Sequence, residues 1–273
     1  MKPFLKWPGG KHRLSALICS KMEPGKRLVE PFTGSGAIFT NAAFDRYLLA
    51  DSNPDLISLF SLLTAEGESF IRYCRRFFQP ENNAADVYYR LRDEFNASRN
   101  PRRRAAIFLY LNRHCYNGLI RYNSKRLFNT PFGRYAKPYF PERELRHFQQ
   151  KSVRAEFLRA DYQQCLDLVV EGDVVYCDPP YDPLSATANF TAYHAGGFAW
   201  PDQERLAERA RTIAGRGIQV IISNHNTPAI RKLYKSLGAR IETLRVRRSI
   251  GPDHASRGKV EEVIAIFGST LNP

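Results

Sequence analysis

The chain has 273 residues, of which 43% are hydrophobic and 25% are charged, so it can form one large domain or two modest ones around a real core. It carries 41 Lys and Arg residues against 27 Asp and Glu, a formal net charge of +14. Such an excess favours a polyanionic partner, nucleic acid first and an acidic membrane surface second, although a basic enzyme without such a partner would have the same balance. The five cysteines are widely spaced and form no C-x-x-C pair, which argues against a disulfide framework and against a zinc site.

The amino terminus carries the motif Phe4-Leu5-Lys6-Trp7-Pro8-Gly9-Gly10-Lys11. A Trp between two lysines and beside a glycine pair can stack on a nucleobase while a lysine contacts its polar groups, although such a Trp is often only a core anchor. The charged start contains no signal-peptide core, and no stretch of the sequence approaches the roughly 20 apolar residues of a membrane span. We therefore expect a cytoplasmic protein, associated with the nucleoid if its partner is DNA, and a monomer as the simplest state.

A buried strand is predicted over 27–31, and it leads into the turn Glu30-Pro31-Phe32-Thr33-Gly34-Ser35-Gly36 and a helix. Gly34 and Gly36 let the backbone turn tightly and approach a ligand closely, although many such turns need glycine for packing alone. The next predicted strand, 47–51, ends at Asp51, where an acid can accept hydrogen bonds from both hydroxyls of a ribose. The turn lacks the full G-x-G-x-x-G pattern and is not a phosphate loop, so these features predict a nucleoside ligand without a pyrophosphate.

The middle of the chain, from about residue 55 to about residue 144, contains helical patterns and no strong buried strand. Helices are predicted around 56–63 and 103–111, and residues 116–135 are rich in Asn, Gly, Pro, Arg and aromatic side chains, which predicts a hairpin or a long loop. We expect an inserted domain over 55–144, between the two parts of a main domain formed by 1–54 and 145–273. A helical cap on a single domain is the alternative.

Positive charge is concentrated in this insert. Residues 95–141 contain no Asp or Glu, and the segment from 102 to 137 carries nine basic residues, which are Arg102, Arg103, Arg104, Arg113, Arg121, Lys125, Arg126, Arg134 and Lys137. Charge runs are usually solvated faces, but here aromatic residues are interleaved with them. That mixture suits contact with phosphates together with base stacking, so it favours nucleic-acid binding.

A third buried strand is predicted over 174–177, and Asp178-Pro179-Pro180-Tyr181 follows it directly. The two prolines remove amide donors and hold the segment extended, so the Pro179 carbonyl can point outward as an acceptor. An ionised Asp178 offers acceptors only, and Tyr181 provides a flat stacking surface beside them. The alternative, a rigid turn at a sheet edge, is disfavoured by the position at a strand end.

This motif is suited to receiving both hydrogens of an amino group. The adenine amino nitrogen is a poor nucleophile, because its lone pair is delocalised into the ring. Acceptors for its two hydrogens favour a tetrahedral nitrogen whose lone pair can attack a sulfonium methyl group held in line. Catalysis would then consist of positioning and electrostatics, without a metal, and a duplex adenine would have to be flipped out to reach Tyr181.

The remaining elements complete an α/β pattern. A helix is predicted over 202–214, a buried strand over 219–223 and a late antiparallel strand over 261–267. Strands that alternate with helices predict a Rossmann-like mixed sheet, with cofactor binding at the carboxyl ends of its strands. The fold class that we expect is therefore α/β, with an inserted, mainly helical domain that carries a β-hairpin.

The order of these motifs resembles the Dam family of adenine-N6 DNA methyltransferases: residues 4–11, then 30–36, then Asp51, then a basic insert, then 178–181. The resemblance covers nearly the whole chain. It implies the fold of class I S-adenosylmethionine-dependent methyltransferases, with that cofactor and no metal, and double-stranded DNA as partner. It also implies the target palindrome GATC, a recognition domain over 55–144, and catalysis by Asp178, Pro179 and Tyr181.

The resemblance also implies which residues bind the cofactor. Asp161-Tyr162, after residues 157–160, resembles the segment near the cofactor adenine, and the glycine turn would line the methionine end. The implied cofactor residues are Trp7, Lys11, Glu30, Phe32, Gly34, Gly36, Asp51, Asp161, Tyr162 and Asp178.

Base reading is implied for the start of the insert's hairpin and for one residue of the amino-terminal motif. In the family, the residues that match Leu119, Arg121 and Pro131 touch bases, and Lys6 resembles the lysine that reads the outer guanine. Arg121 suits a bidentate contact to guanine, and Leu119 suits a thymine methyl group.

Two further roles in DNA binding are implied. Residues that match Tyr116 and Asn117 enter the opened base stack, and those that match Asn129, Arg134 and Tyr135 hold backbone phosphates.

Late segments are implied to contact DNA as well. Residues 185–194, which include Asn189 and His194, are similar to the loop that closes over the target, and residues 247–250, which include Arg248, resemble a segment that grips phosphates. We assign no catalysis to His194. One departure is Cys115, which stands where related sequences commonly carry glycine, so the hairpin entrance is expected to differ in shape.

Other functions remain open from the sequence. Related strand-end motifs also position RNA bases or protein glutamine amides for methylation, although the Dam-like hairpin counts against these substrates. A DNA-binding regulator without catalysis is a further alternative, and the intact Asp51 and 178–181 motif argue against it.

Overall fold

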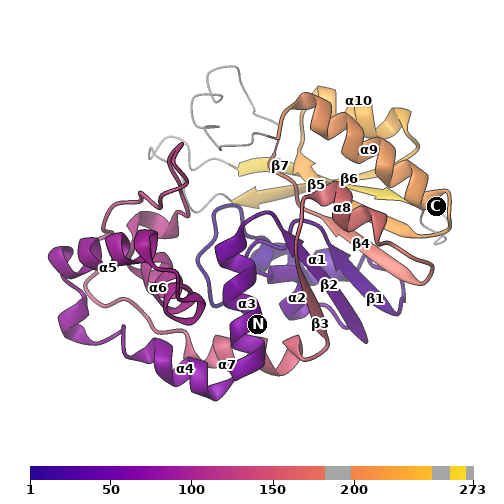
Figure 1. The fold of residues 1–273 in the computed structure, drawn as a ribbon. Coiled ribbons are helices and arrows are strands. Elements are labelled where there is room, and N and C mark those ends of the chain that lie inside the picture. The colour runs from indigo at the N-terminus through magenta and orange to yellow at the C-terminus, as the bar shows by residue number, and fades with distance from the viewer. Residues whose placement is uncertain (182–197, 248–258, 269–273) are drawn as a thin grey trace. The chain divides into compact units, whose positions relative to one another are not determined.

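The computed structural model describes residues 1–181, 198–247 and 259–268 (Figure 1). Within these residues the strands are β1 (Arg27–Glu30), β2 (Arg46–Asp51), β3 (Ala155–Arg159), β4 (Asp173–Cys177), β5 (Gln219–His225), β6 (Arg240–Arg247) and β7 (Lys259–Phe267). The helices are α1 (Ser15–Cys19), α2 (Ala37–Asn41), α3 (Pro54–Glu66), α4 (Glu68–Arg75), α5 (Ala85–Ala97), α6 (Pro101–His114), α7 (Glu142–Ser152), α8 (Tyr162–Asp167), α9 (Trp200–Ala214) and α10 (Pro228–Ser236). Short 3-10 helices are η1 (Lys11–Leu14), η2 (Pro80–Asn82) and η3 (Tyr116–Gly118).

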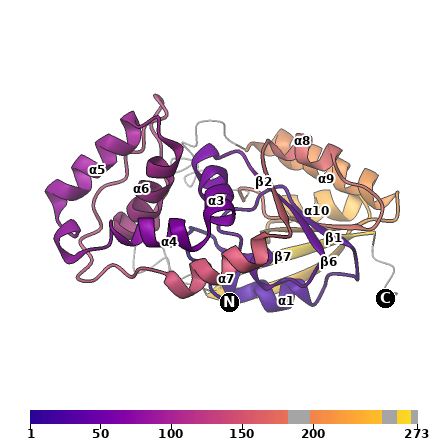
Figure 2. The ribbon, with the colours of Figure 1, turned by 60° about the horizontal axis from the view of Figure 1, so that its bottom comes forward.

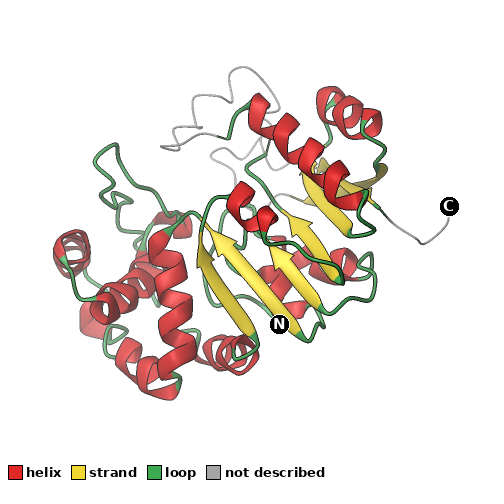
Figure 3. Cartoon of the chain, turned by 45° about the vertical axis from the view of Figure 1, so that its right-hand side comes forward, coloured by secondary structure: helices red, strands yellow, loops and turns green. Residues whose placement is uncertain are grey.

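The strands form a seven-stranded mixed sheet in the order β3-β2-β1-β4-β5-β7-β6. Figure 3 draws the strands in yellow. Strand β1 pairs in parallel with β2 and with β4, and β4 pairs in parallel with β5. Strand β7 is antiparallel to both β5 and β6, in the register Ile222↔Ala265 and Ile241↔Ala265. This confirms the predicted α/β class, the four buried strands and the late antiparallel strand. The strand order reverses at β1, and in open α/β sheets ligands bind at such a reversal.

The chain divides into two compact units, which are described separately. Unit 2 contains residues 20–32, 44–50 and 160–273. Every residue of β4 and β5 is buried, which is why each strand contains a continuous apolar run, 174–177 in β4 and 220–222 in β5. Helix α9 packs on β5 and β7, and α10 packs on β6. The carboxyl ends of the parallel strands β4 and β5 carry polar residues: Asp178 directly follows β4, and Asn224 is the second-last residue of β5.

Unit 1 contains residues 1–19, 33–43 and 51–159 and is mainly helical. Helices α3, α4 and α6 pack against one another, and α5 packs on α6 (Figures 1 and 2). Helix α3 begins where the Asn53 side chain accepts hydrogen bonds from the amides of Asp55 and Leu56. Phe148 of α7 lies at the centre of an aromatic core, with its ring 4.6 Å from that of Phe60 and 5.1 Å from that of Phe4. The helices predicted around 56–63 and 103–111 are therefore present, as α3 and α6.

Candidate functional site

The glycine turn after β1 has the backbone conformation that glycine permits. Gly34 and Gly36 have φ angles of 49° and 69°, in the left-handed region. A Cβ atom on Gly34 would lie 2.9 Å from Nε1 of Trp7, so the indole of the amino-terminal motif packs directly on this turn. The structure therefore brings together two of the predicted cofactor residues, and it leaves no space for a larger residue between them.

Asp51 at the end of β2 is joined to the same turn. Its Oδ2 accepts a hydrogen bond of 3.0 Å from the Gly34 amide, and its Oδ1 accepts one of 2.9 Å from the Asn53 amide. Burial raises the pKa of Asp51, and these two hydrogen bonds offset part of that effect. Each carboxylate oxygen can accept a further hydrogen bond, which is the capacity that a ribose hydroxyl needs.

Lys11 begins η1 and is 5% exposed, an unusual environment for a lysine. Its ammonium group donates a hydrogen bond of 3.0 Å to the Gly9 carbonyl, within the exposed turn that follows Trp7. The sequence motif is thus a compact loop in which Trp7 and Lys11 are held by the chain itself.

The expected cofactor residues of unit 2 form an aromatic group and a helix cap. The Phe32 ring stacks on that of Tyr162 with centroids 5.5 Å apart, and Phe198 contacts both rings edge-on. Asp161 caps α8, where its Oδ1 accepts hydrogen bonds of 2.8 and 3.0 Å from the amides of Gln163 and Gln164. Glu30 ends β1 and is 2% exposed.

The turn Asp178-Pro179-Pro180-Tyr181 directly follows β4, as predicted. Asp178 and Tyr181 are half-buried, and Pro179 is buried. The Tyr181 hydroxyl donates a hydrogen bond of 3.0 Å to Oε2 of Glu262. Burial, together with the negative charges of Asp178 and Glu262, raises the pKa of Tyr181 well above its ordinary value, so the phenol stays protonated and remains a donor.

Residues that the sequence analysis did not identify surround Tyr181. The ring of His225 meets the Tyr181 ring edge-on, with centroids 4.7 Å apart. His225 is the last residue of β5 and pairs in register with Glu262 of β7. Polar residues at the end of the buried run 219–223 were the available signal, since side chains at the carboxyl ends of parallel strands commonly form ligand sites.

The segment after α6 in unit 1 folds back on itself, as the predicted hairpin requires. Two antiparallel bridges, Cys115↔Phe132 and Tyr122↔Phe128, hold its two sides together. Asn123 closes the tip, where its Oδ1 accepts hydrogen bonds of 3.0 Å from the amides of Lys125 and Leu127.

Predicted base-reading and phosphate residues lie on this hairpin, and two of them, Arg121 and Asn129, contact each other. Nε of Arg121 donates a hydrogen bond of 2.7 Å to Oδ1 of Asn129, and Arg121 is exposed. Leu119 is half-buried, while Pro131 and Arg134 are exposed. The hairpin therefore presents apolar and cationic side chains to solvent along one segment.

The base of the hairpin holds Lys6 of the amino-terminal motif. The Lys6 ammonium lies 3.7 Å from the centroid of the Tyr135 ring, and the Tyr135 hydroxyl accepts a hydrogen bond of 2.9 Å from the Asn117 amide. Burial and the neighbouring Arg113 guanidinium lower the pKa of Lys6 to about 8. Tyr116, one residue before Asn117, is 52% exposed.

Cys115 is accommodated inside the hairpin entrance. Its side chain is fully buried, with Sγ 3.4 Å from the Leu119 carbonyl oxygen, and burial raises the pKa of the thiol to about 12. Gly133 faces it across the bridge, and a Cβ atom there would lie 2.7 Å from the Cys115 carbonyl oxygen. The thiol is therefore enclosed within the hairpin entrance, whereas Arg121 and Pro131 are exposed to solvent.

The hairpin is anchored to the helices by a buried carboxylate. The Tyr122 hydroxyl donates a hydrogen bond of 2.6 Å to Oδ2 of Asp55, which is 6% exposed. Arg104 forms two hydrogen bonds with the same carboxylate, of 2.5 and 3.1 Å. Tyr122, the residue after Arg121, is therefore held to Asp55 of α3, which is itself bonded to Arg104 of α6.

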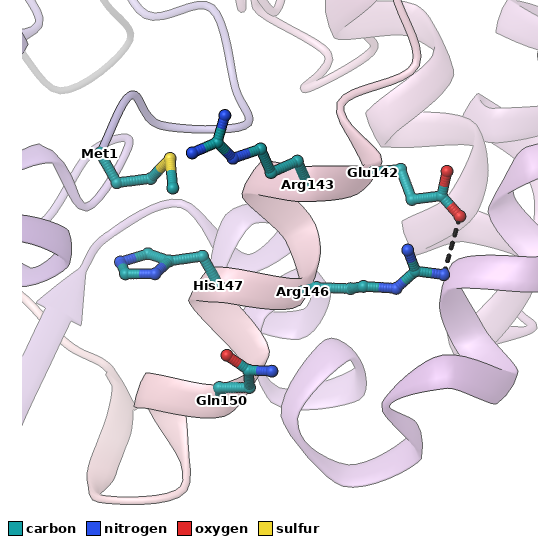
Figure 4. Close-up of a pocket in the computed structure, with 6 residues that line it drawn as sticks. All are labelled: Met1, Glu142, Arg143, Arg146, His147 and Gln150. Atoms are coloured by element: carbon teal, nitrogen blue, oxygen red, sulfur yellow. Dashed lines mark hydrogen bonds and ion pairs between the residues drawn. The ribbon is translucent and has the colours of Figure 1, made fainter.

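Some predicted features lie elsewhere. Asn189, His194 and Arg248 fall outside the described residues. Among the described residues, no group of His, Cys, Asp and Glu side chains could hold a metal ion, and no helix could cross a membrane. A cavity of about 380 Å³ on α7 is lined by Met1, Glu142, Arg143, Arg146, His147 and Gln150 (Figure 4), and none of these is a predicted site residue.

Comparison with known proteins identifies the family. The family model for the D12 class N6 adenine-specific DNA methyltransferase matches residues 7–250. The DNA adenine methylase of Escherichia coli strain K12 is 49% identical over 266 residues, which are 97% of this chain and 95% of that protein. The DNA adenine methylase of Vibrio cholerae serotype O1 is 48% identical over 272 residues, 99% of this chain and 98% of that protein. The solved structure of precorrin 8W decarboxylase from Methanobacterium thermoautotrophicum covers 98% of this chain, at 14% identity and a TM-score of 0.43, which is too low for an argument about fold. The chain therefore belongs to the D12 class of N6 adenine-specific DNA methyltransferases and is an enzyme that methylates adenine in DNA.

Proposed function

We propose that this enzyme transfers a methyl group from S-adenosylmethionine to N6 of the adenine in double-stranded GATC, after flipping that adenine out of the duplex. The observation that carries the proposal is the turn after β4, in which Asp178 precedes two prolines and Tyr181 is held by Glu262. Relatives named DNA adenine methylase, at 48–49% identity over nearly the whole chain, support adenine in DNA as the target. We further propose that the enzyme acts as a monomer in the cytoplasm, on the DNA of the nucleoid.

S-adenosylmethionine fits the residues of the glycine turn and their neighbours. Gly34 and Gly36 adopt the left-handed backbone conformations that shape this turn, and Asp51 retains acceptor capacity for the ribose hydroxyls. Trp7 and Lys11 would bind the adenine end of the cofactor. Roles in cofactor binding are also proposed for Glu30, Phe32, Asp161, Tyr162 and Asp178. When bound, this cofactor supplies an electrophilic methyl group on its sulfonium.

The chain's own residues then prepare the amino group of the target. The Asp178 carboxylate and the Pro179 carbonyl accept the two hydrogens of the adenine amine, which localises the nitrogen lone pair for attack. Tyr181 offers its ring face to the flipped base, and its hydroxyl is occupied by Glu262, so the ring keeps one orientation. Because the reaction is a direct displacement, positioning supplies most of the rate enhancement.

Sequence recognition is assigned to the inserted domain over 55–144, with help from the amino terminus. Arg121 would form a bidentate contact with guanine, Leu119 would contact the thymine methyl group, and Pro131 would lie beside them. Lys6 would read the outer guanine. Its cation–π contact with Tyr135 places it at the base of the hairpin.

The rest of the insert would open the duplex and hold its backbone. Tyr116 is exposed and Asn117 follows it at the hairpin entrance, and both would fill the gap that the flipped base leaves. Asn129, Arg134 and Tyr135 would contact phosphates, as Asn189 and Arg248 would from the later segments.

The test uses purified protein, S-adenosylmethionine and unmethylated plasmid, followed by digestion with a nuclease that cuts GATC only when its adenine is methylated. Cutting at every GATC would support S-adenosylmethionine as cofactor, N6 of adenine as the methylated atom and GATC as the target sequence. Methyl label in the plasmid without cutting would support methyl transfer to DNA but refute GATC as the target sequence. Label in RNA or in a protein amide, with none in duplex DNA, would overturn the proposal.

A further inference from the structure

Two buried amide side chains connect α9 and β5 to the turn that carries Asp178. Gln203 lies in the first turn of α9 and is 1% exposed, and Asn224 lies near the end of β5 and is fully buried. Nδ2 of Asn224 donates a hydrogen bond of 2.9 Å to Oε1 of Gln203, and Nε2 of Gln203 donates one of 3.0 Å to the Pro180 carbonyl. This relay of two amides therefore ends on the backbone of the turn.

The orientation of both amides follows from their neighbours. Nδ2 of Asn224 also donates a hydrogen bond of 3.0 Å to the hydroxyl of Tyr234, and its Oδ1 accepts one of 2.8 Å from the His225 amide. Asn224 must therefore present a donor to Gln203, which leaves the Gln203 donors for Pro180. Because unsatisfied polar atoms are costly in a buried site, the alternative orientations are disfavoured.

The relay acts on the turn at two residues, Pro180 and Tyr181. The pyrrolidine ring fixes φ of Pro180, and the hydrogen bond from Gln203 fixes the direction of its carbonyl and hence ψ. Asn224 holds the backbone of His225, whose ring packs edge-on against Tyr181. The ψ angle of Pro180 and the position of the Tyr181 ring are thus held by groups outside the turn.

We propose that Gln203 and Asn224 are positioning residues for methyl transfer, which hold the turn 178–181 in the conformation that accepts the adenine amino group. The inference rests on the catalytic role proposed for that turn. Under this proposal the relay contributes to catalysis as well as to stability, because it keeps the acceptor groups of the turn in position. Displacement of a reacting group by about 1 Å can lower a rate about 100-fold.

The chain contains a matched control in Gln219, at the opposite end of β5. This glutamine is 2% exposed, and its amide likewise donates a hydrogen bond of 3.0 Å to a backbone carbonyl, that of Lys21, and accepts one of 2.9 Å from the Glu23 amide. Gln203→Met and Gln219→Met therefore remove the same buried group with the same pattern of bonds. Only Gln203→Met removes a hydrogen bond to the turn 178–181.

Steady-state kinetics with GATC duplex and S-adenosylmethionine distinguish a positioning role of Gln203 from a purely structural one. We expect Gln203→Met to lower kcat about 10- to 100-fold, with KM for DNA and for cofactor changed less than about threefold, and Gln219→Met to keep the wild-type kcat. Both variants should lose similar amounts in Tm. Equal kcat in the two methionine variants would overturn the proposal.

A second variant keeps the test decisive if Gln203→Met does not fold. Gln203→Glu preserves size and the acceptor for Asn224, but an ionised carboxylate cannot donate to the Pro180 carbonyl. Burial raises the pKa of a carboxyl group, and its protonated form can donate. We expect kcat of this variant, relative to wild type at each pH, to recover as pH falls, and a flat ratio would contradict the proposal.

Asp178→Ala separates this inference from the proposed function. If Asp178→Ala is inactive while Gln203→Met turns over normally, the turn is catalytic and the relay is only structural. If Asp178→Ala retains full turnover, the assignment of the turn fails, and the inference fails with it.

Discussion

The backbone amide of Gly34 donates a hydrogen bond of 3.0 Å to the carboxylate of Asp51, so the glycine turn after β1 and the acid at the end of β2 are held together. Trp7 packs on the same turn. The turn of the proposed cofactor site is therefore held in place by a hydrogen bond and packing contacts of the chain itself. Changes at any of these three residues should act on cofactor affinity before they act on DNA binding.

Gly34→Ala should weaken cofactor binding strongly. The residue has a φ angle of 49°, where other residues are strained by about 1–3 kcal/mol, and the added Cβ would lie 2.9 Å from Nε1 of Trp7. We expect the dissociation constant of S-adenosylmethionine, measured by calorimetry, to rise at least about tenfold. Gly217→Ala is the control, since its φ angle is 79° and an added Cβ meets nothing within 4 Å. Equal affinities in the two variants would show that the turn does not contact the cofactor.

Cofactor affinity should decrease on acidification in a way that depends on Asp51. Burial raises the pKa of this carboxyl group, so it becomes protonated at a higher pH than an exposed aspartate and then loses acceptor capacity for the ribose. The dissociation constant should therefore be lowest above that pKa and rise as pH falls through it. Asp51→Asn should bind more weakly at neutral pH and lose this pH dependence. If the affinity of the wild-type enzyme for S-adenosylmethionine stayed constant down to the pH of unfolding, Asp51 would not be the acceptor for the ribose hydroxyls.

Tyr122→Phe should loosen the recognition hairpin. The variant removes the hydrogen bond to the Asp55 carboxylate, and the loss of a bond to a buried charged group costs about 1–3 kcal/mol. We expect a lower Tm and reduced discrimination between GATC and one-base variants, with an unchanged affinity for the cofactor. Tyr89→Phe, at a tyrosine that is 39% exposed, is the control and should change none of these. If Tyr122→Phe discriminated between these sequences as well as the wild type does, the Tyr122–Asp55 hydrogen bond would not be needed to position the hairpin.

Arg121→Ala and Arg134→Ala should affect DNA differently. Both side chains are exposed on the hairpin, but Arg121 is assigned to a guanine and Arg134 to phosphate. We expect Arg121→Ala to lose about 1–3 kcal/mol of discrimination at one base pair. Arg134→Ala should weaken binding to all sequences and flatten its salt dependence. Methylation of a duplex series with single substitutions in GATC, over a range of salt concentrations, measures both. An unchanged sequence preference in Arg121→Ala would assign base reading to other residues.

The strands that the sequence predicts are those with continuous apolar runs, and the strands that it misses are the two at the edges of the sheet. Strand β6 carries charged residues at Arg240, Glu242 and Arg245, and β3 is only partly buried. Edge strands are commonly short or charged, which prevents aggregation and weakens the pattern that prediction uses. The late strand β7 was predicted because it pairs on both sides and is apolar at its end.

The candidate site was predictable where neighbouring residues carry the chemistry. The glycine turn, Asp51 and the turn 178–181 are local motifs, and each was located at the end of its strand. The partners of Tyr181 were not predictable in the same way. Glu262 is 81 residues away in the chain, and only the register of β5 with β7 brings it beside His225. Such pairings are set by sheet topology and leave no local pattern.

The most direct test of the account is turnover by Asp178→Ala, with Asp178→Asn as the conservative variant. Both are assayed in single-turnover methylation of a GATC duplex, with binding of the same duplex measured in parallel. The account predicts that Asp178→Ala loses methylation while its affinity for DNA stays within about threefold of wild type, because the recognition hairpin is untouched. Asp178→Asn should also lose most activity, since an amide replaces one acceptor with a donor. Normal turnover by Asp178→Ala would contradict the central claim that this turn accepts the adenine amino group.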